Sequence, residues 1–384
     1  MKAVVFKGIG DIALEEVQSP IIQDPKDALV RITMSTICGT DLHMIRGSMT
    51  GMQPGTILGH EGVGIVEKVG ADVKKIKVGD RVIIPSTIAC GTCDYCKKKI
   101  YSQCDYYTHN DSQTNTAFYG GPKKSGPFNG MQAEMVRVPF ADVGLVTIPT
   151  DVTDSQAILL SDILPTAYMG VEMADIQPTD NIAVFGCGPV GQLVILLLKR
   201  SGIKTIFAID NVPSRLALAE KQGAHAINFD HEDPVSVLKK LTHGKGPDKI
   251  IDAVGIDAEQ PHYTWADSSD HQAQWLPGNA PWQALQWEVD ALCKAGTLSI
   301  IGVYPGPFHL FPIGTAMGKN LIIKMGNCNH RAYIPKLLEW VHKKEIDLTP
   351  FITQTISFDK VIDAYKHFDK REDGWLKVAL LMPS

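Results

Sequence analysis

The stretch Ile182-Ala-Val-Phe-Gly-Cys-Gly-Pro-Val-Gly191 decides the fold. Its first four residues are apolar, as in a buried strand, and the residues from Val190 to Arg200 follow a helical pattern. The three glycines form G-x-G-x-x-G at this strand-to-helix junction. They would allow a tight turn, a close approach of backbone to a diphosphate, and close packing of helix on strand, with helix N–H groups facing the diphosphate. The predicted cofactor-binding residues of the motif are Gly186, Gly188, Pro189, Val190 and Gly191.

An acidic residue supports this interpretation, because Asp210 ends the next strand-like run, 19 residues after Gly191. A carboxylate there can accept hydrogen bonds from both ribose hydroxyls of NAD and would repel the 2′-phosphate of NADP. The alternative role for Asp210 is to cap the helix that Pro213 begins. Arg215 could meet a 2′-phosphate or could lie beside the adenosine ribose. We predict that Asp210 and Arg215 contact the cofactor and that the cofactor is NAD.

Alternating strand and helix patterns surround the glycine motif. Helical patterns at 190–200 and 213–222 fit between the first strand-like runs, and this alternation predicts a doubly wound, six-stranded parallel sheet. The six runs are Ile182–Phe185, Thr205–Ile209, Ala224–Phe229, Lys249–Val254, Thr297–Val303 and Leu321–Met325.

The first ~150 residues are rich in glycine, turn signals and short strand-like runs, which predicts a mostly β domain. A chain of 384 residues is long enough for about two domains. We therefore predict a mostly β domain at 1–160, a dinucleotide-binding domain at 161–328, and a C-terminal segment at 329–384 that returns to the first domain. That segment has two helical patterns, at 333–343 and 360–370, and a closing strand at 375–381. The strand-like runs of the first domain are Lys2–Phe6, Ala28–Met34, Gly62–Val69 and Arg81–Ile84.

Composition excludes several classes of protein. Hydrophobic residues make up 44% and charged residues 21% of the chain, which is ordinary for a globular protein. The formal charge of -5 implies no nucleic-acid partner. The longest apolar run, Val190–Leu198, is too short to span a membrane, and the N-terminal apolar run is too short for a signal peptide. We expect a cytoplasmic protein, because cysteines outside one cluster are far apart and resemble reduced thiols.

That cluster is Cys90-x2-Cys93-x2-Cys96-x7-Cys104. Four thiolates this close can surround one tetrahedral Zn²⁺ and stabilise a short loop, which we predict as a structural zinc lobe at about 88–106. Disulfide pairing is the alternative, and it fits a reducing compartment poorly. A non-catalytic, nucleic-acid-binding zinc protein is a further alternative that the lobe and the nearby Lys97-Lys98-Lys99 could suggest, but the net charge and the lack of a broader basic patch argue against it.

Upstream of the lobe lies a second set of metal-ligand residues, Cys38-Gly-Thr40-Asp41-Leu-His43 and Gly59-His60-Glu61. A catalytic zinc needs three protein ligands and one open position. Cys38 and His60 could supply two ligands, with Glu61 adjacent. Taken singly, each of these residues is as well explained by packing, capping or surface charge.

Taken together and in this order, the two ligand motifs, the four-cysteine lobe and the glycine motif resemble the zinc-dependent medium-chain alcohol dehydrogenases over essentially the whole chain. The segment Ser161-Asp162-Ile-Leu-Pro165-Thr166-Ala-Tyr168, with an extra stretch at 257–290, is most similar to the glutathione-independent formaldehyde dehydrogenase branch. The resemblance implies a GroES-like catalytic domain, a Rossmann domain, two Zn²⁺ per subunit, NAD, and a homo-oligomer, either dimer or tetramer.

The resemblance also implies residue roles. Cys38, His60 and Asp162 would bind the catalytic zinc, with Glu61 as an alternative or outer ligand and Asp41 hydrogen-bonded to His60. Thr40 would take the substrate hydroxyl proton and pass it, by way of the nicotinamide ribose, to His43. Thr166 would line the nicotinamide. Lys377 would contact the diphosphate, although a solvated lysine on an edge strand is the alternative. Asp162 departs from the cysteine common in relatives, and a harder ligand should leave the zinc more Lewis acidic.

The implied function is hydride transfer between NAD and a small alcohol or aldehyde, such as formaldehyde or a short-chain alcohol. A polyol or threonine-type dehydrogenase is the alternative within the superfamily. The polar stretch 257–290 is predicted to be irregular and holds four of the six tryptophans: Trp265, Trp275, Trp282 and Trp287. A long loop in a compact fold is usually functional, and an oligomer contact is the alternative. Our hypothesis is that it folds over NAD, slows its release, and allows aldehyde dismutation with retained NAD.

Overall fold

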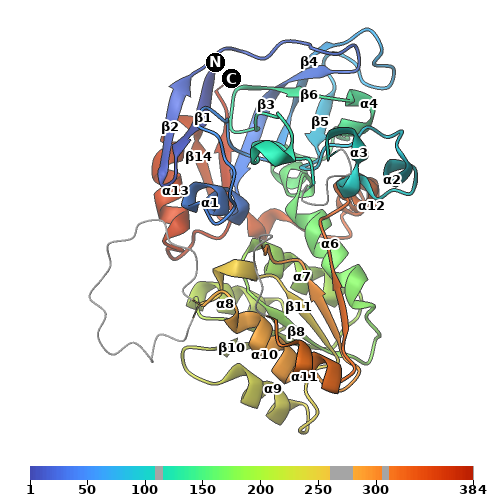
Figure 1. Cartoon of the computed structure of the whole chain (residues 1–384), viewed down its shortest axis with the longest axis vertical. Coiled ribbons are helices and arrows are strands. Elements are labelled where there is room, and N and C mark those ends of the chain that lie inside the picture. The colour runs from blue at the N-terminus through green and yellow to red at the C-terminus, as the bar shows by residue number, and fades with distance from the viewer. Residues whose placement is uncertain (109–115, 260–279, 305–310, 384) are drawn as a thin grey trace. The chain divides into compact units, whose positions relative to one another are not determined.

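The computed structural model describes residues 1–108, 116–259, 280–304 and 311–383, and the chain divides into two compact units (Figure 1). One unit combines Met1–Pro165 with Cys328–Ser384, and the other is Thr166–Asn327. Along the chain, the boundaries between the units fall at 165/166 and 327/328. The sequence predicts them at 160/161 and 328/329. The C-terminal segment belongs to the same unit as the N-terminus.

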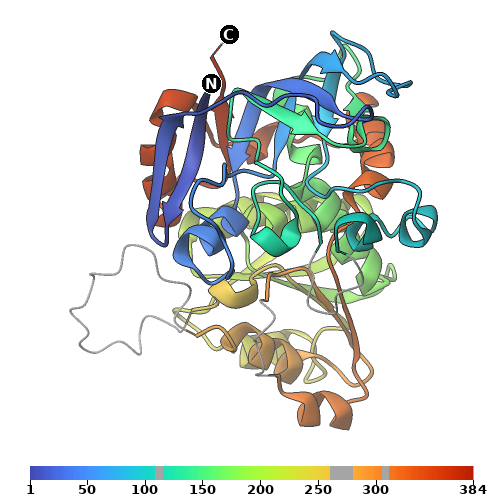
Figure 2. The same ribbon diagram turned by 45° about the horizontal axis from the view of Figure 1, so that its top comes forward.

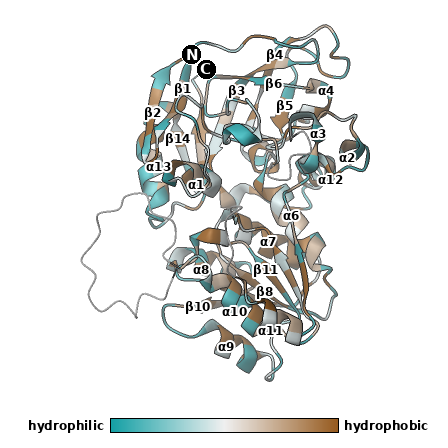
Figure 3. Ribbon diagram, viewed as in Figure 1, coloured by the Kyte–Doolittle hydropathy of each residue, from teal (hydrophilic) through white to brown (hydrophobic). Residues whose placement is uncertain are grey.

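The second unit is built on a six-stranded sheet whose strands all run parallel. The spatial order β10-β9-β8-β11-β12-β13 confirms the predicted doubly wound sheet. Figure 3 shows its strands as largely hydrophobic, as expected for a sheet buried on both faces. The strands are β8 (Asn181–Phe185), β9 (Thr205–Asp210), β10 (His225–Asn228), β11 (Lys249–Asp252), β12 (Thr297–Ile300) and β13 (Ile322–Met325).

Helices connect these strands and cover the sheet. Three of them begin with proline at the first turn, where the missing N–H costs nothing. The α10 helix packs against both α9 and α11, whereas α7 packs against α8. The helices of this unit after α6 are α7 (Pro189–Arg200), α8 (Pro213–Lys221), α9 (Pro234–Leu241), α10 (Gln283–Ala291) and α11 (Ile313–Gly318).

One prediction for this unit is wrong. The stretch 257–290 is not irregular to its end, because α10 begins at Gln283. Trp287 lies on this helix and packs against the ring of Phe229, with 5.5 Å between ring centroids, beside the apolar core of the sheet. Leu285 and Val289, one helical turn apart, are buried on the same helix, and the polar residues between them obscure this spacing in the sequence. Residues 260–279, which include Trp265 and Trp275, lie outside the described residues. The hypothesis that this stretch folds over NAD concerns those residues and stays a prediction.

The first unit contains a seven-stranded sheet of order β14-β15-β3-β4-β5-β7, in which β6 also pairs with β3. The C-terminal β15 pairs antiparallel with β3, so the end of the chain completes the sheet begun near its start. The hairpin β1–β2 lies outside this sheet. The strands are β1 (Lys2–Gly8), β2 (Asp11–Glu16), β3 (Ala28–Ile37), β4 (Gly62–Val69), β5 (Arg81–Ile84), β6 (Met135–Val138), β7 (Val146–Thr147), β14 (Gln354–Ser357) and β15 (Val378–Leu381).

Helices at the margins of this sheet carry or support the candidate site. Within this unit, α13 packs against β2, β14 and β15, as the red helix beside the blue hairpin shows in Figure 2. The helices are α1 (Gly39–Arg46), α2 (Asp94–Lys97), α3 (Asp105–Thr108), α4 (Ala141–Gly144), α5 (Asp154–Ala157), α12 (His330–His342) and α13 (Val361–Asp369), and α6 (Ile163–Ala174) leads into the second unit. Among the described residues no single helix could cross a membrane, although the bent pair 154–160 and 163–174 passes on length and composition.

Candidate metal centres and cofactor site

The thiol of Cys38 stands at the start of α1 because the residues after it form a reciprocal cap. Cys38 is the N-cap, and its backbone N–H donates to Oδ2 of Asp41 at 3.0 Å. Asp41 is fully buried, and its other carboxylate oxygen lies 3.2 Å from Nδ1 of His60. One side chain therefore fixes both the helix that presents Cys38 and the ring of His60.

Gly59 and the side chain of Gln132 help to position His60. Gly59 has φ +93°, and a Cβ there would lie 2.5 Å from Cγ of Gln132, so only glycine fits before the histidine. The amide of Gln132 donates to Asp41 Oδ2 at 3.2 Å and accepts from the hydroxyl of Tyr365 at 2.8 Å. This buried chain of polar groups supports His60 from the side away from its Nε2.

Asp162 reaches the same place from a distant part of the chain. The hydroxyl of Ser161 donates to the carbonyl of Ile84 at 2.6 Å and accepts from the N–H of Gly62 at 3.1 Å, which ties this segment to β5 and β4. Oδ2 of Asp162 then lies 3.4 Å from Nε2 of His60. The structure thus brings together the three residues predicted to bind the catalytic zinc.

With Glu61, these three residues offer ligand atoms that all lie within 4.8 Å of one another: Cys38, His60, Glu61 and Asp162. Neither ring nitrogen of His60 has an aligned hydrogen-bond partner among the described residues, so the buried Nε2 suits a metal. One thiol, one imidazole and a carboxylate are a donor set that Zn²⁺ accepts with a position left open. The residues of this cluster therefore fit a bound Zn²⁺.

The electrostatic field at this point also favours a cation. Burial opposes protonation of His60, but the charges of Asp41 and Cys38 outweigh it and raise the pKa of His60 well above its ordinary value. Burial also opposes ionisation of Asp162, but the hydrogen bond with His330 and the nearby ring of His60 hold the pKa of Asp162 well below its usual range. The same field that attracts a proton would attract a metal ion.

Lys377 is buried beside Glu61, which excludes one of its two sequence alternatives. It is 1% exposed, its Nζ contacts Oε2 of Glu61 at 2.5 Å, and it donates to the carbonyl of Ile37 at 3.1 Å. It is therefore not a solvated lysine on an edge strand, since β15 is flanked by β14 and β3. Burial raises the pKa of Glu61 to about 7, even though Lys377 favours the ionised carboxylate. A contact of Lys377 with the diphosphate stays a prediction.

Thr40 and His43, the predicted proton-relay residues of this unit, both lie on α1. Thr40 is partly exposed in the first turn of α1, and His43 is buried one turn later, with Nδ1 3.4 Å from the hydroxyl of Ser48. Phe118 meets the ring of His60 edge-on at 6.2 Å between centroids. The roles of Thr40 and His43 in proton transfer stay predictions.

His330 is the site residue that the sequence analysis missed. It begins α12, and its Nε2 lies 2.5 Å from Oδ1 of Asp162, whereas its Nδ1 lies 3.2 Å from the hydroxyl of Thr87. Burial disfavours its protonation, but Cys328 and Asp162 outweigh it and raise the pKa of His330 to about 10. No local motif marks it, because its partners are remote in sequence.

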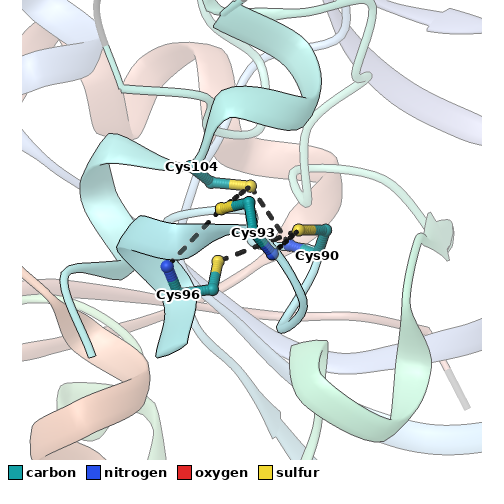
Figure 4. A group of neighbouring side chains, drawn as sticks. All are labelled: Cys90, Cys93, Cys96 and Cys104. Atoms are coloured by element: carbon teal, nitrogen blue, oxygen red, sulfur yellow. Dashed lines mark hydrogen bonds between the residues drawn. The ribbon is translucent and has the colours of Figure 1, made fainter. Parts of the chain in front are cut away.

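The four-cysteine lobe has the geometry of a closed metal site (Figure 4). All four thiols are free, and the distances between sulfur atoms are 3.9 Å for Cys90 and Cys96 and 4.0 Å for Cys93 and Cys104. A tetrahedron with Zn–S of about 2.3 Å has edges of about 3.8 Å, whereas a disulfide needs about 2.05 Å. Burial opposes ionisation of Cys90, but hydrogen bonds from Thr92 and Cys93 outweigh it and lower its pKa to about 6. The distances therefore fit zinc and not a disulfide.

In the second unit, the glycine motif has the backbone that the sequence predicted. Gly186 has φ +85°, and a Cβ at Gly191 would lie 1.8 Å from the carbonyl oxygen of Gly186. Gly188 caps α7, and the atom nearest a Cβ there would be Nη1 of Arg215 at 3.8 Å. The helix Pro189–Arg200, with Val190 in its first turn, therefore presents free N–H groups beside open backbone, as a diphosphate site requires. Thr166 lies on α6 at the start of this unit.

Asp210 connects the second strand to this loop. Its Oδ2 accepts from the N–H of Cys187 at 2.7 Å, and its Oδ1 accepts from the N–H groups of Asn211 and Val212 at 2.8 and 2.9 Å. Val212, and not Asp210, is the N-cap of α8. The carboxylate is therefore held at the end of β9, against the glycine loop, where an adenosine ribose would lie.

Two family models match the chain: an alcohol dehydrogenase GroES-like domain at residues 24–150 and a zinc-binding dehydrogenase at residues 189–263. An uncharacterized zinc-type alcohol dehydrogenase-like protein of Bacillus subtilis (strain 168) is 36% identical over 99% of this chain and 100% of its own length. A glutathione-independent formaldehyde dehydrogenase of Pseudomonas aeruginosa (strain LESB58) is 34% identical, but over only 67% of this chain and 66% of its own length.

Among solved structures, an alcohol dehydrogenase from Thermus sp. ATN1 has a TM-score of 0.84 and 34% identity, with full coverage of both chains. The fold, the converging ligand residues and the full-length relatives agree. The chain belongs to the zinc-dependent medium-chain alcohol dehydrogenase family.

Proposed function

We propose that this oxidoreductase transfers hydride between NAD and a small alcohol or aldehyde at a catalytic zinc held by Cys38, His60 and Asp162. The observation that carries the proposal is the convergence of these three side chains, with Glu61, within 4.8 Å in one buried cluster. A second zinc in the four-cysteine lobe would be structural, because four thiolates fill its coordination.

Each protein ligand has a support that keeps it in place. Asp41 orients His60, Ser161 fixes the backbone beside Asp162, and Lys377 holds Glu61 by one carboxylate oxygen. When bound, zinc supplies Lewis acidity that stabilises negative charge on a substrate oxygen. Glu61 could serve as an outer or alternative ligand of the zinc, because its Oε1 has no hydrogen-bond partner among the described residues.

The proton of the substrate hydroxyl would pass to residues of α1. The hydroxyl of Thr40 is partly exposed in the first turn, so it can accept that proton, and His43 on the same helix would receive it. The ring of Phe118 against His60 would keep water from one side of the cluster. NAD, held by the glycine motif and Asp210, would supply the hydride acceptor for an alcohol that becomes an aldehyde or ketone.

We propose NAD rather than NADP because a carboxylate, Asp210, stands at the end of β9 beside the glycine loop. Its negative charge would repel a 2′-phosphate and accept the ribose hydroxyls instead. Arg215, whose guanidinium lies near Gly188, would then sit beside the diphosphate or ribose. Asp210→Ser should therefore raise the relative activity with NADP.

The second unit leaves apolar residues exposed on its edge strand and on α11, which we propose are covered by a second copy of the chain. The side chains are Ile313, Met317, Ile322 and Met325, each more than half exposed. A self-complementary strand edge allows pairing about a two-fold axis, which would give a dimer or a tetramer built from dimers. A measurement of the mass in solution, with Met317→Lys as the disrupting variant, tests whether the chain forms this oligomer.

The free cysteines are consistent with our expectation of a cytoplasmic enzyme.

A substrate panel tests the proposed reaction. Purified protein is given formaldehyde, short-chain alcohols, polyols or threonine with NAD or NADP, and nicotinamide absorbance is followed. Aldehyde dismutation leaves that absorbance flat, so aldehyde loss is measured in parallel. We expect turnover with short alcohols or formaldehyde and NAD, lost in Cys38→Ser. Turnover only with polyols or threonine would favour the alternative dehydrogenase, and no hydride transfer with any of them would refute the proposal.

A further inference from the structure

The third metal ligand has a partner of its own. Oδ1 of Asp162 lies 2.5 Å from Nε2 of His330, and the opposite ring nitrogen of His330 lies 3.2 Å from the hydroxyl of Thr87. His330 is 4% exposed and Thr87 is 7% exposed, so water competes little for these contacts. Thr87, His330 and Asp162 therefore form a buried line of hydrogen-bonding groups that ends at the metal cluster.

The support of Asp162 by His330 has a counterpart in the support of His60 by Asp41. There, Asp41 holds a histidine ligand by the ring nitrogen that faces away from the cluster. Here, His330 holds an aspartate ligand by one carboxylate oxygen, while the other, Oδ2, lies 3.4 Å from Nε2 of His60 on the cluster side. The two ligands are thus fixed from behind by residues of different elements, α1 for His60 and α12 for Asp162.

We propose that His330 is a positioning residue that makes Asp162 a one-oxygen ligand of the catalytic metal, an inference that rests on the proposed zinc site. An aspartate side chain can rotate and can offer a metal one oxygen or two. The contact with His330 engages Oδ1 and directs Oδ2 to the metal. It also draws negative charge from the carboxylate, so Asp162 donates less to the metal and leaves it more Lewis acidic.

The contrast between two replacements of His330 gives the test. The amide nitrogen of glutamine can stand close to Nε2 of histidine, so His330→Gln keeps a donor to Asp162, whereas His330→Leu removes it. His342→Leu is the matched control, because His342 lies on the same helix in a half-exposed pair with Asp151, 2.8 Å away. Thr87→Val weakens the same line at its far end and serves if His330→Leu folds poorly.

The readouts are metal affinity, by competition with a chelator, and the visible absorption of the Co²⁺-substituted protein. Both are taken for the metal equivalent that Cys38→Ser lacks. We expect His330→Leu to bind this metal about 10- to 100-fold more weakly and to shift the Co²⁺ bands. His330→Gln should stay within a few-fold of wild type, Thr87→Val should fall between, and His342→Leu should be unchanged.

Three results would count against one or the other of two claims, the role of His330 and the zinc site itself. Wild-type affinity and an unshifted Co²⁺ spectrum in folded His330→Leu, or in Thr87→Val if His330→Leu does not fold, would overturn the role of His330 and leave the zinc site standing. An equally large loss in His330→Gln would also overturn it, because a donor would then not suffice. If wild-type protein itself lacks the second metal equivalent, the proposed function fails, and not this inference alone.

Discussion

Replacing Gly191 with alanine should damage the fold of the second unit, whereas the same change at Gly188 should damage only cofactor binding. A Cβ at Gly191 would lie 1.8 Å from the carbonyl oxygen of Gly186, whereas ordinary contact begins at 3.4 Å, so α7 and the loop must separate by about 1.6 Å. The oxygen belongs to backbone at φ +85°, which cannot rotate away as a side chain would. Gly188 has φ -66°, which alanine adopts freely, and its Cβ would meet nothing closer than 3.8 Å.

Overpacking typically costs about 1–3 kcal/mol, and a backbone clash this close belongs at the upper end, about 3 kcal/mol. For a unit of this size the melting temperature should fall by roughly 6–12 °C. Gly188→Ala should melt within about 2 °C of wild type, because it disturbs no contact of the protein. Its methyl group would instead occupy the space of the diphosphate, so the Kd for NAD should rise at least about tenfold, or about 1.4 kcal/mol.

Thermal unfolding followed by circular dichroism and NAD titration by calorimetry measure the two effects separately. Gly314→Ala, on α11 and with nothing within 4 Å of its Cβ, serves as a control for replacing a helical glycine where there is space. Normal melting of Gly191→Ala would refute the steric reasoning. A Gly188→Ala protein that melts early and still binds NAD normally would refute the assignment of the two glycines.

Three further changes test the lobe, a buried acid and the support of His60. Cys90→Ser should lose one zinc per subunit and unfold more easily before it affects hydride transfer, and normal stability with lost transfer would contradict the structural role. Glu288 is fully buried in the second unit with no hydrogen-bond partner among the described residues, and burial raises its pKa well above the ordinary value. The folded state then binds more protons than the unfolded state above about pH 4.5, so stability falls as pH rises. Glu288→Gln should therefore stabilise by about 1–3 kcal/mol near pH 8 and less near pH 5, as urea unfolding at the two pH values would show. Tyr365→Phe removes the hydroxyl that donates to Gln132 and should cost about 0.5–1.5 kcal/mol in urea unfolding, and an unchanged free energy of unfolding would exclude a role for this bond.

The features that the sequence predicted well are local ones. The glycine motif and the acid at the end of β9 depend on spacing within one strand-helix-strand unit, and the structure has both where they were expected. The cysteine lobe is equally local. The helix α10 was missed because its buried side chains are separated by polar ones and follow a long polar stretch.

The rest of the site depends on contacts between distant segments, which spacing cannot reveal. Asp162 could be named only through resemblance to a family, because nothing near it in sequence marks a ligand. His330 contacts the ligand Asp162, and Tyr365 contacts Gln132 behind His60, each through a hydrogen bond between residues more than a hundred positions apart in sequence. The burial of Lys377, which excludes the solvated alternative, depends on β15 pairing with both β14 and β3.

Zinc content per subunit, measured alongside NAD binding in wild type, Cys38→Ser and Asp162→Ala, tests the central claim most directly. We predict two zinc ions in wild type, one in Cys38→Ser, and lost turnover with NAD binding largely intact in both variants. A single zinc in wild type, or activity retained in Asp162→Ala, would contradict the catalytic centre proposed here.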